Sequence, residues 1–351
     1  MKSNRNTVFR IAVSIILVVL TSSFVSYVVH KNRSADYDKE VLKSYADENV
    51  SSMDKYDITE FDLIDKSILS KEAMLSEEYT KNLVEQGAIN ILFLGEDKEN
   101  SLYDTIGLIS IDKKNKKLSI IMLPRDLYID YSQTVKDALA AAGKTKAAGI
   151  YKLNAAHYVG ALMEYEGKFK ANSISFLADV IKEKFAIDVD DYIKINLSGF
   201  RKIVNLYGGV NIYVPYNMDY DDPSQDLSIH LQKGSQLLDG NQAEGFVRFR
   251  QGYDENGIRF DVDRKKNQLA FLNAFIKQHG TIGNINKIPD LLKALSSNMM
   301  NSIGFGELLT TYTGIAKDIV NDKYEIENKN IDGTSKMING VSYIVIEEEK
   351  P

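Results

Sequence analysis

Charged side chains stand at the ends of three short apolar segments in the first part of the main domain. The segments are rich in branched residues and short enough to be buried strands: Ile89–Leu94, Thr105–Ile111 and Leu118–Leu123. The charged residues beside them are Asp97, Asp104, Arg125 and Asp126. If the strands are neighbours, their loops bring carboxylates and a guanidinium to one rim of a sheet. Because carboxylate oxygens suit Mg²⁺ and arginine binds phosphate bidentately, the pattern indicates a metal–phosphate site; ordinary polar strand ends are the alternative.

A second group of cations lies in the later part of this acidic chain. It consists of Arg248, Arg250, Arg259 and Arg264. On a strand, Arg248 and Arg250 would share one face. Apolar spacing predicts a helix over 263–276, and Arg264 would lie in its first turn, where backbone N–H groups attract anions. The group predicts a pyrophosphate site, and the alternative is a surface of ion pairs, because acidic residues stand among the arginines.

The elements that must position these residues alternate between helices and strands. Apolar spacing predicts two helices, Ser173–Lys184 and Phe200–Tyr207, and two strands, Tyr192–Asn196 and Val210–Val214. We expect Ser173 and Asn241 to act as helix N-caps. The pair Gly208–Gly209 is expected to end the second helix, where a left-handed backbone is needed. This alternation is typical of an α/β layered fold.

Two polar stretches between these elements carry no recognisable chemistry. Residues 138–149 are low in complexity and lack large apolar side chains, which indicates a flexible excursion beside the site. Residues 217–228 contain four aspartates, but the ligand spacing of a calcium loop is absent. We therefore expect a solvated loop there.

The composition narrows the class of protein. The chain has 351 residues, 44% hydrophobic and 26% charged, which is enough for one large domain with appendages. A net charge of −6 argues against nucleic acid as the main partner. The sequence has no cysteine, which excludes disulfides and thiolate chemistry, and its four histidines are too scattered for a metal motif.

The N-terminal region has the composition of a membrane anchor. Residues 1–10 form a basic tail, and Ile11–Val29 carries no charge over a length that roughly matches the ~30 Å hydrocarbon core. A cleaved signal peptide is the alternative. The excess of positive charge before the span places the N-terminus in the cytoplasm and the remainder outside the cell. Residues 30–86 are expected to form a partly helical stalk that acts as a spacer, and the main domain covers 87–351.

Seven blocks of the sequence, taken in order, resemble the LytR–CpsA–Psr family of cell-wall glycopolymer ligases from Gram-positive bacteria. They are NILFLGEDK, YDTIGLISID, LPRDLY, KLNAAHYVG, GGVNIYVP, KGSQLLDGNQAEGFVRFR and DVDRKKNQ. The resemblance covers about residues 87–280, with the anchor in front and a weaker match at 338–346. It implies a three-layer α-β-α sandwich with a central mixed sheet, preceded by a transmembrane helix and the stalk.

The resemblance also implies an activity and assigns residues to it. The expected reaction is the Mg²⁺- or Mn²⁺-dependent transfer of a polyprenyl-pyrophosphate-linked glycopolymer onto peptidoglycan, with pyrophosphatase activity as a side reaction. The polymer would be teichoic acid, capsule or another polysaccharide. Asp97 and Asp104 match the metal carboxylates, and Asp126 supports the loop of the pyrophosphate-binding Arg125. The residues that match the family's other pyrophosphate contacts are Arg248, Arg250, Arg264 and Gln268.

The sequence departs from the family pattern at three places where arginine is common. Lys98 and Glu99 follow Asp97, Leu102 and Tyr103 precede Asp104, and Asn267 takes the second arginine position after Arg264. Lysine does not reproduce the bidentate fork of arginine. These substitutions favour the alternative function, a non-catalytic polyprenyl-phosphate-binding scaffold or regulator of exopolysaccharide assembly. A transcriptional attenuator has no support in a cytoplasmic tail this short.

Overall fold

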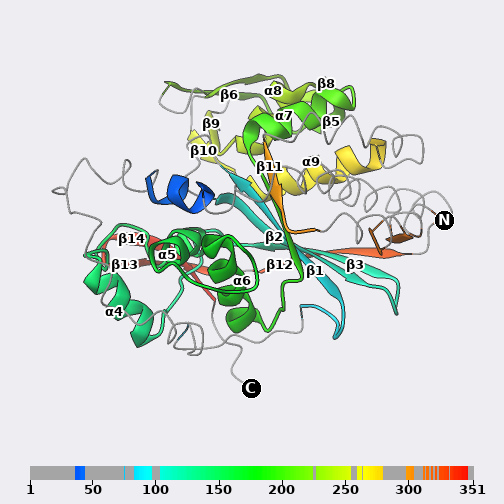
Figure 1. Ribbon diagram of the computed structural model, residues 1–351. Coiled ribbons are helices and arrows are strands. Elements are labelled where there is room, and N and C mark those ends of the chain that lie inside the picture. Colours follow the sequence, from blue (N-terminus) through cyan, green and yellow to red (C-terminus); the bar gives the residue numbers. More distant parts are fainter. Residues whose placement is uncertain are drawn as a thin grey trace. The chain divides into compact units, whose positions relative to one another are not determined.

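Figure 1 shows the computed structural model of the protein. The structure describes residues 36–43, 75, 83–96, 103–223, 227–253, 259–262, 264–279, 298–303, 324–331 and 333–346, with isolated positions between 311 and 321. The predicted tail and anchor, residues 1–29, lie outside the described residues, as does Asp97. Among the helices within these ranges, none is long and apolar enough to span a bilayer.

The chain divides into two compact units. We call one the sheet unit; it comprises Val29–Asp112, Ser119–Lys194 and Asn328–Pro351. The other, the helical unit, comprises Lys113–Leu118 and Ile195–Glu327.

The sheet unit is built on a mixed sheet. Its strands are β1 (Ile89–Glu96), β2 (Tyr103–Asp112), β3 (Lys117–Leu123), β4 (Asp191–Ile195) and β12 (Glu325–Asn330), in the order β4-β1-β2-β3-β12. Strands β1 and β2 are antiparallel. The Asp190 N–H donates to the Asn90 carbonyl at 2.8 Å, so β4 and β1 start side by side and run parallel. The three apolar segments at the start of the domain are therefore neighbouring strands, which is the condition for their charged ends to meet at one rim.

Helices and a terminal hairpin complete the sheet unit. They are α4 (Gln133–Ala141), the short 3₁₀ helix η2 (Leu153–Ala155), α5 (Ala156–Leu162), α6 (Asn172–Phe185), β13 (Thr334–Ile338) and β14 (Val341–Val345). Helices α5 and α6 pack closely because Gly160 lacks a side chain; a Cβ there would lie 2.3 Å from the Cβ of Phe176. Helix α4 covers the start of residues 138–149, so the expectation of a flexible excursion is wrong for that part.

The start of α6 corrects a predicted cap. Ser173 lies inside the helix, one residue after its start, and the N-cap is Ala171, whose side chain makes no cap hydrogen bond. The carboxylate of Asp38 accepts hydrogen bonds from the N–H groups of Asn172 (2.9 Å) and Ser173 (3.1 Å) instead. A carboxylate at this position also suits the positive end of the helix dipole. Asp38 belongs to a helix over residues 36–43, drawn blue in Figure 1.

The helical unit contains α7 (Leu197–Leu206), α8 (Gly240–Arg248) and α9 (Arg264–His279), and α8 packs against the other two. Its described strands are β5 (Val210–Val214), β6 (Met218–Asp222), β7 (Leu227–Leu231), β8 (Gly234–Leu238), β9 (Gln251–Tyr253), β10 (Arg259–Asp261) and β11 (Met299–Asn301). Antiparallel pairs join β5 to β8, β6 to β7 and β9 to β10. The solvated loop expected at 217–228 is therefore wrong, since most of that stretch forms the β6–β7 ribbon.

Several other sequence predictions are confirmed in this unit. Strand β5 has the predicted bounds, and α7 covers most of the predicted helix. Gly208 and Gly209 follow α7 with positive φ of 83° and 89°, a conformation that glycine adopts without strain. The predicted α/β class, with a mixed sheet and flanking helices, is confirmed, whereas the three-layer arrangement stays a prediction.

Candidate active site

A β-bulge sets the position of Asp104. Gly95 on β1 lies opposite Thr105 on β2, but the next residue of β1, Glu96, lies opposite Tyr103, so Asp104 is an extra residue on β2. Bulges bend a strand and redirect a side chain, and they recur beside active sites. Tyr103 is fully buried, whereas the Asp104 side chain is 23% exposed. The bulge thus presents a carboxylate to solvent next to a buried aromatic ring.

The end of β3 brings a guanidinium to this carboxylate. Arg125 Nη1 donates a hydrogen bond to Asp104 Oδ1, and its Nε lies 3.5 Å from Asp126 Oδ2. Lys152 Nζ lies 3.0 Å from Asp126 Oδ1 and extends the series. The result is an alternating row of two carboxylates and two cations, carried by the β2 bulge, the loop after β3 and the residue before η2. A guanidinium has five N–H donors, so Arg125 can hold Asp104 and also bind phosphate oxygens.

Backbone hydrogen bonds fix the loop that carries Arg125. The carbonyl of Arg125 accepts from the Asn154 N–H at 2.9 Å, and the carbonyl of Asp126 accepts from the Ile344 N–H at 2.8 Å. The segment is therefore tied to η2 on one side and to β14 on the other. Such anchoring holds the guanidinium in place before any ligand binds, which preorganisation at a charged site requires.

Lys152 is a site residue that the sequence did not single out. It lies just before η2 in the KLNAAHYVG block, and its Nζ is 5.8 Å from the centre of the Tyr343 ring. The ion pair with Asp126 leaves its side chain 22% exposed. The sequence did carry a signal for Lys152, because it is a basic residue at the start of a block that resembles the family.

The predicted metal site is only partly within the described residues. Within these ranges, no group of three His, Asp or Glu side chains is arranged to hold a metal ion. Asp104 is a partly exposed carboxylate, and Mg²⁺ is held in many proteins by one or two carboxylates with water and substrate oxygens. Asp104 therefore fits the donor chemistry of such an ion, and its pairing with Asp97 stays a prediction.

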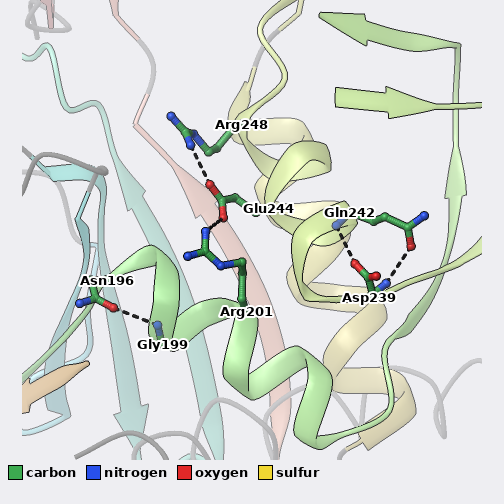
Figure 2. Close-up of polar contacts among 7 residues, drawn as sticks. All are labelled: Asn196, Gly199, Arg201, Asp239, Gln242, Glu244 and Arg248. Carbon is green, nitrogen blue, oxygen red and sulfur yellow. Dashed lines mark hydrogen bonds and ion pairs between the residues drawn. The ribbon is translucent and has the colours of Figure 1, made fainter. Parts of the chain in front are cut away.

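In the helical unit, a buried carboxylate holds two arginines (Figure 2). Glu244 Oε1 accepts from Arg248 Nη1 at 2.7 Å, and Glu244 Oε2 accepts from Arg201 Nη1. The Glu244 and Arg248 side chains are each 8% exposed, whereas Arg201, on α7, is 36% exposed. Glu244 neutralises part of the positive charge and orients both guanidinium groups. Glu244 was not predicted from the sequence, although its spacing of four residues before Arg248 was a signal.

The local sequence explains why α8 presents Arg248 in this way. Asp239 and Gln242 form a capping box, in which each side chain accepts a hydrogen bond from the other residue's backbone N–H (Figure 2). The cap is thus Asp239, one position outside the helix, and the expectation for Asn241 is wrong. Gly240 allows close contact with α7, because a Cβ there would lie 2.5 Å from the Arg201 carbonyl oxygen.

The other predicted cations lie in different environments. Arg248 is the last residue of α8, and Arg250 is exposed beyond the helix end, so they do not share a strand face. Arg264 is the first residue of α9 and so lies in its first turn, as predicted, and Gln268 lies one turn further along. Asn267, at the place of a common family arginine, is buried and 4% exposed. Arg259, on β10, is exposed and its Nη2 lies 3.4 Å from Asp261 Oδ1.

Comparison with known proteins identifies the family of this chain. The profile of the LytR_cpsA_psr family matches residues 58–350. The chain belongs to this family. It is 25% identical to the polyisoprenyl-teichoic acid–peptidoglycan teichoic acid transferase TagU of Oceanobacillus iheyensis, over 76% of this chain and 73% of that protein. It is also 25% identical to the TagU protein of Enterococcus faecalis, over 78% of this chain and 80% of that one.

Solved structures show the same fold. The crystal structure of protein gbs0355 from Streptococcus agalactiae aligns with a TM-score of 0.55 and 22% identity, over 75% of this chain and 83% of that one. The LytR_cpsA_psr resemblance predicted from the seven sequence blocks is therefore confirmed. Within the described residues, those that the resemblance assigns to the site lie in two places, the Asp104–Arg125–Asp126 row of the sheet unit and the arginines of the helical unit.

Proposed function

We propose that this protein transfers a glycopolymer from a polyprenyl pyrophosphate carrier to a hydroxyl group of peptidoglycan. The observation that carries the proposal is the preorganised row at the bulge, where Arg125 is held between Asp104 and Asp126. The names of the teichoic acid transferases to which the chain is similar support the same reaction class. Teichoic acid is the best-supported polymer, with capsule or another polysaccharide as further candidates.

The reaction is a phosphoryl transfer in which one P–O bond replaces another. The acceptor hydroxyl oxygen attacks the phosphorus that carries the glycan. A P–O bond forms to the acceptor, the P–O bond to the lipid phosphate breaks, and the lipid phosphate leaves with the electron pair. A carboxylate of the site takes the hydroxyl proton, either Asp104 or an Asp97 that holds no metal. With water in place of the acceptor, the same steps give the pyrophosphatase side reaction.

The cations of the chain stabilise the charge that this step creates. The leaving phosphate gains negative charge as its bond breaks, and fixed positive groups lower the energy of that state. Arg125 is assigned to the pyrophosphate, and Lys152 orients the loop through Asp126. The assignment of Arg248, Arg250, Arg264 and Gln268 to the pyrophosphate follows the family resemblance. A Mg²⁺ or Mn²⁺ ion held by Asp97 and Asp104 would supply further positive charge to the phosphate oxygens.

The N-terminal sequence indicates the location of the protein in the cell. Residues 11–29 are proposed to anchor the chain in the cell membrane, with residues 1–10 in the cytoplasm and the main domain outside the cell. This topology would give the site access to a lipid-linked substrate and to the cell wall on the same side of the membrane. The proposed partners are therefore the lipid-linked glycan, the peptidoglycan acceptor and the membrane.

A non-catalytic polyprenyl-phosphate binder is the second candidate. The observation that favours it is Asn267, a buried neutral residue at a position where the family commonly has arginine. A protein with fewer phosphate-facing cations can still bind the lipid phosphate while losing stabilisation of the transition state. Metal-dependent turnover separates the two candidates.

The test uses the full chain with a short polyprenyl pyrophosphate. Phosphate release is followed with Mg²⁺ and with EDTA, for wild type, Arg125→Ala and the matched control Lys113→Ala, which removes a positive charge from the exposed turn after β2. Release that needs both the metal and Arg125, and that survives in the control, supports the transferase. Tight lipid binding without any release favours the binder, and absence of both contradicts both candidates.

A further inference from the structure

The helix over residues 36–43 is built into the sheet unit. Tyr37 and Val41, one helical turn apart, are 3% and 0% exposed. Asp38, on the same helix, caps α6 through the two backbone N–H groups described above and also accepts from Ser173 Oγ at 2.5 Å. Residues far apart in the sequence are thus joined by buried contacts, which a simple spacer does not need.

Tyr37 contacts the residue that precedes Asp104. The hydroxyl oxygens of Tyr37 and Tyr103 are 2.5 Å apart, and both side chains are buried. Burial raises the pKa of both hydroxyls well above the usual tyrosine value, and the Tyr103 hydroxyl raises that of Tyr37 further. Both groups are therefore protonated at neutral pH, and one donates to the other.

A buried ion pair also lies against Tyr37. Lys194 Nζ bonds to Glu96 Oε1, and the two side chains are 9% and 3% exposed. The same Nζ lies 3.9 Å from the centre of the Tyr37 ring, which shields the pair and attracts the cation. Glu96 and Tyr103 are opposite each other at the bulge. Tyr37 is therefore linked to both strands at the bulge. Its hydroxyl contacts Tyr103 on β2, and its ring lies over Lys194, which pairs with Glu96 on β1.

We infer that Tyr37 is a positioning residue, through which the segment before the main domain holds the Asp104 bulge in its reactive geometry. Asp104 directly follows Tyr103 in β2, so a Tyr103 that is fixed in place restricts where the Asp104 backbone can lie. Tyr103 is held by the Tyr37 hydroxyl and by the His157 ring, whose centroid is 4.3 Å away. The inference rests on the proposed function for its kinetic effect, but the contact between Tyr37 and the bulge does not.

The experiment compares three variants of the full chain. Tyr37→Phe removes only the hydroxyl hydrogen bond and keeps the ring over Lys194, whereas Tyr37→Ala removes both. Lys39→Ala is the matched control, because Lys39 is exposed on the same helix. We measure kcat and KM for phosphate release from a short polyprenyl pyrophosphate, the melting temperature, and amide hydrogen exchange at the start of β2.

The expected result separates positioning from general stability. Loss of one hydrogen bond predicts a fall in kcat of about fivefold for Tyr37→Phe. Displacement of a reacting group predicts a fall of about 10- to 100-fold for Tyr37→Ala, with KM within about twofold of wild type. Amide exchange at Tyr103–Thr105 should be about tenfold faster in Tyr37→Ala, because local opening of β2 no longer has to break the buried contacts with Tyr37. Lys39→Ala should match wild type in all three measurements.

Two outcomes overturn the inference. One is a folded Tyr37→Ala variant whose kcat and amide exchange equal those of Lys39→Ala. The other, if Tyr37→Ala does not fold, is a Tyr37→Phe variant with unchanged kcat and exchange. If wild type itself releases no phosphate, the proposed function fails, and amide exchange alone then decides whether Tyr37 holds the bulge.

Discussion

Removal of the Glu244 carboxylate should destabilise the helical unit more than most single substitutions. In Glu244→Ala, Arg248 stays buried at the end of α8 without the oxygen that it contacts at 2.7 Å. Breaking a buried ion pair from one side costs about 3–5 kcal/mol, because a buried charge loses its compensation. The C-terminal end of a helix favours a cation, which lowers the cost toward about 3 kcal/mol.

The second arginine adds little to this cost. Arg201 is 36% exposed, so water screens its interaction with Glu244, and its share is below about 1 kcal/mol. A total near 3 kcal/mol corresponds to a fall in melting temperature of about 6 °C, at about 2 °C per kcal/mol for a large domain. Glu244→Gln keeps an oxygen acceptor and should lose about half as much.

Thermal unfolding followed by circular dichroism measures the effect, since the chain has no tryptophan. Asn241→Ala, at an exposed position of α8, is the control and should melt like wild type. The double variant Glu244→Ala with Arg248→Met should recover much of the loss, because it leaves no buried charge unpaired. A Glu244→Ala protein that melts within about 1 °C of wild type would show that this ion pair contributes no stability.

Four further predictions test packing, capping, phosphate binding and ionisation. Gly160→Ala should cost about 1–3 kcal/mol, because the new Cβ would lie 2.3 Å from a side-chain carbon of α6; an unchanged melting temperature would contradict this close packing. Asp239→Ala should cost about 1 kcal/mol through loss of the α8 capping box, and Asp239→Asn should restore most of it. Arg125→Lys should lower kcat/KM for phosphate release by about 30-fold, since a charged hydrogen bond is lost, and activity equal to wild type would exclude bidentate binding. Burial raises the pKa of Tyr158 and Tyr207 to about 12. Between their unfolded pKa of about 10 and this value, only the unfolded state loses these protons, so the free energy of unfolding should fall by about 1.4 kcal/mol per pH unit for each tyrosine. Urea unfolding at a series of pH values measures this fall, and a free energy of unfolding that does not change with pH would refute it.

Periodic apolar patterns predicted the elements that carry the site. Strands β1, β2 and β3 came from short branched segments, and the helix predicted over 263–276, which overlaps most of α9, came from helical spacing. These features depend on neighbours in the sequence, so one sequence is enough to find them. The contact between Asp104 and Arg125 was within reach for the same reason, because both residues lie at ends of adjacent strands.

Features that depend on distant residues were not predictable in this way. Asp38 caps α6 from a separate helix, so the nearer Ser173 was wrongly assigned. The ion pair of Arg201 with Glu244 joins two helices whose packing no local pattern reveals. To predict the bulge at Asp104, one must know the register between β1 and β2, and the sequence of a single strand does not contain that register.

The most direct test of the account is transfer of a labelled glycopolymer to peptidoglycan. The full chain is incubated with a lipid-linked labelled polymer, purified peptidoglycan and Mg²⁺, and label in the washed insoluble wall is counted. We predict metal-dependent transfer by wild type and by Lys113→Ala, and loss of transfer in Arg125→Ala and Asp104→Asn. Transfer that persists in both site variants, or wild-type protein that binds the lipid but transfers nothing, would contradict the account.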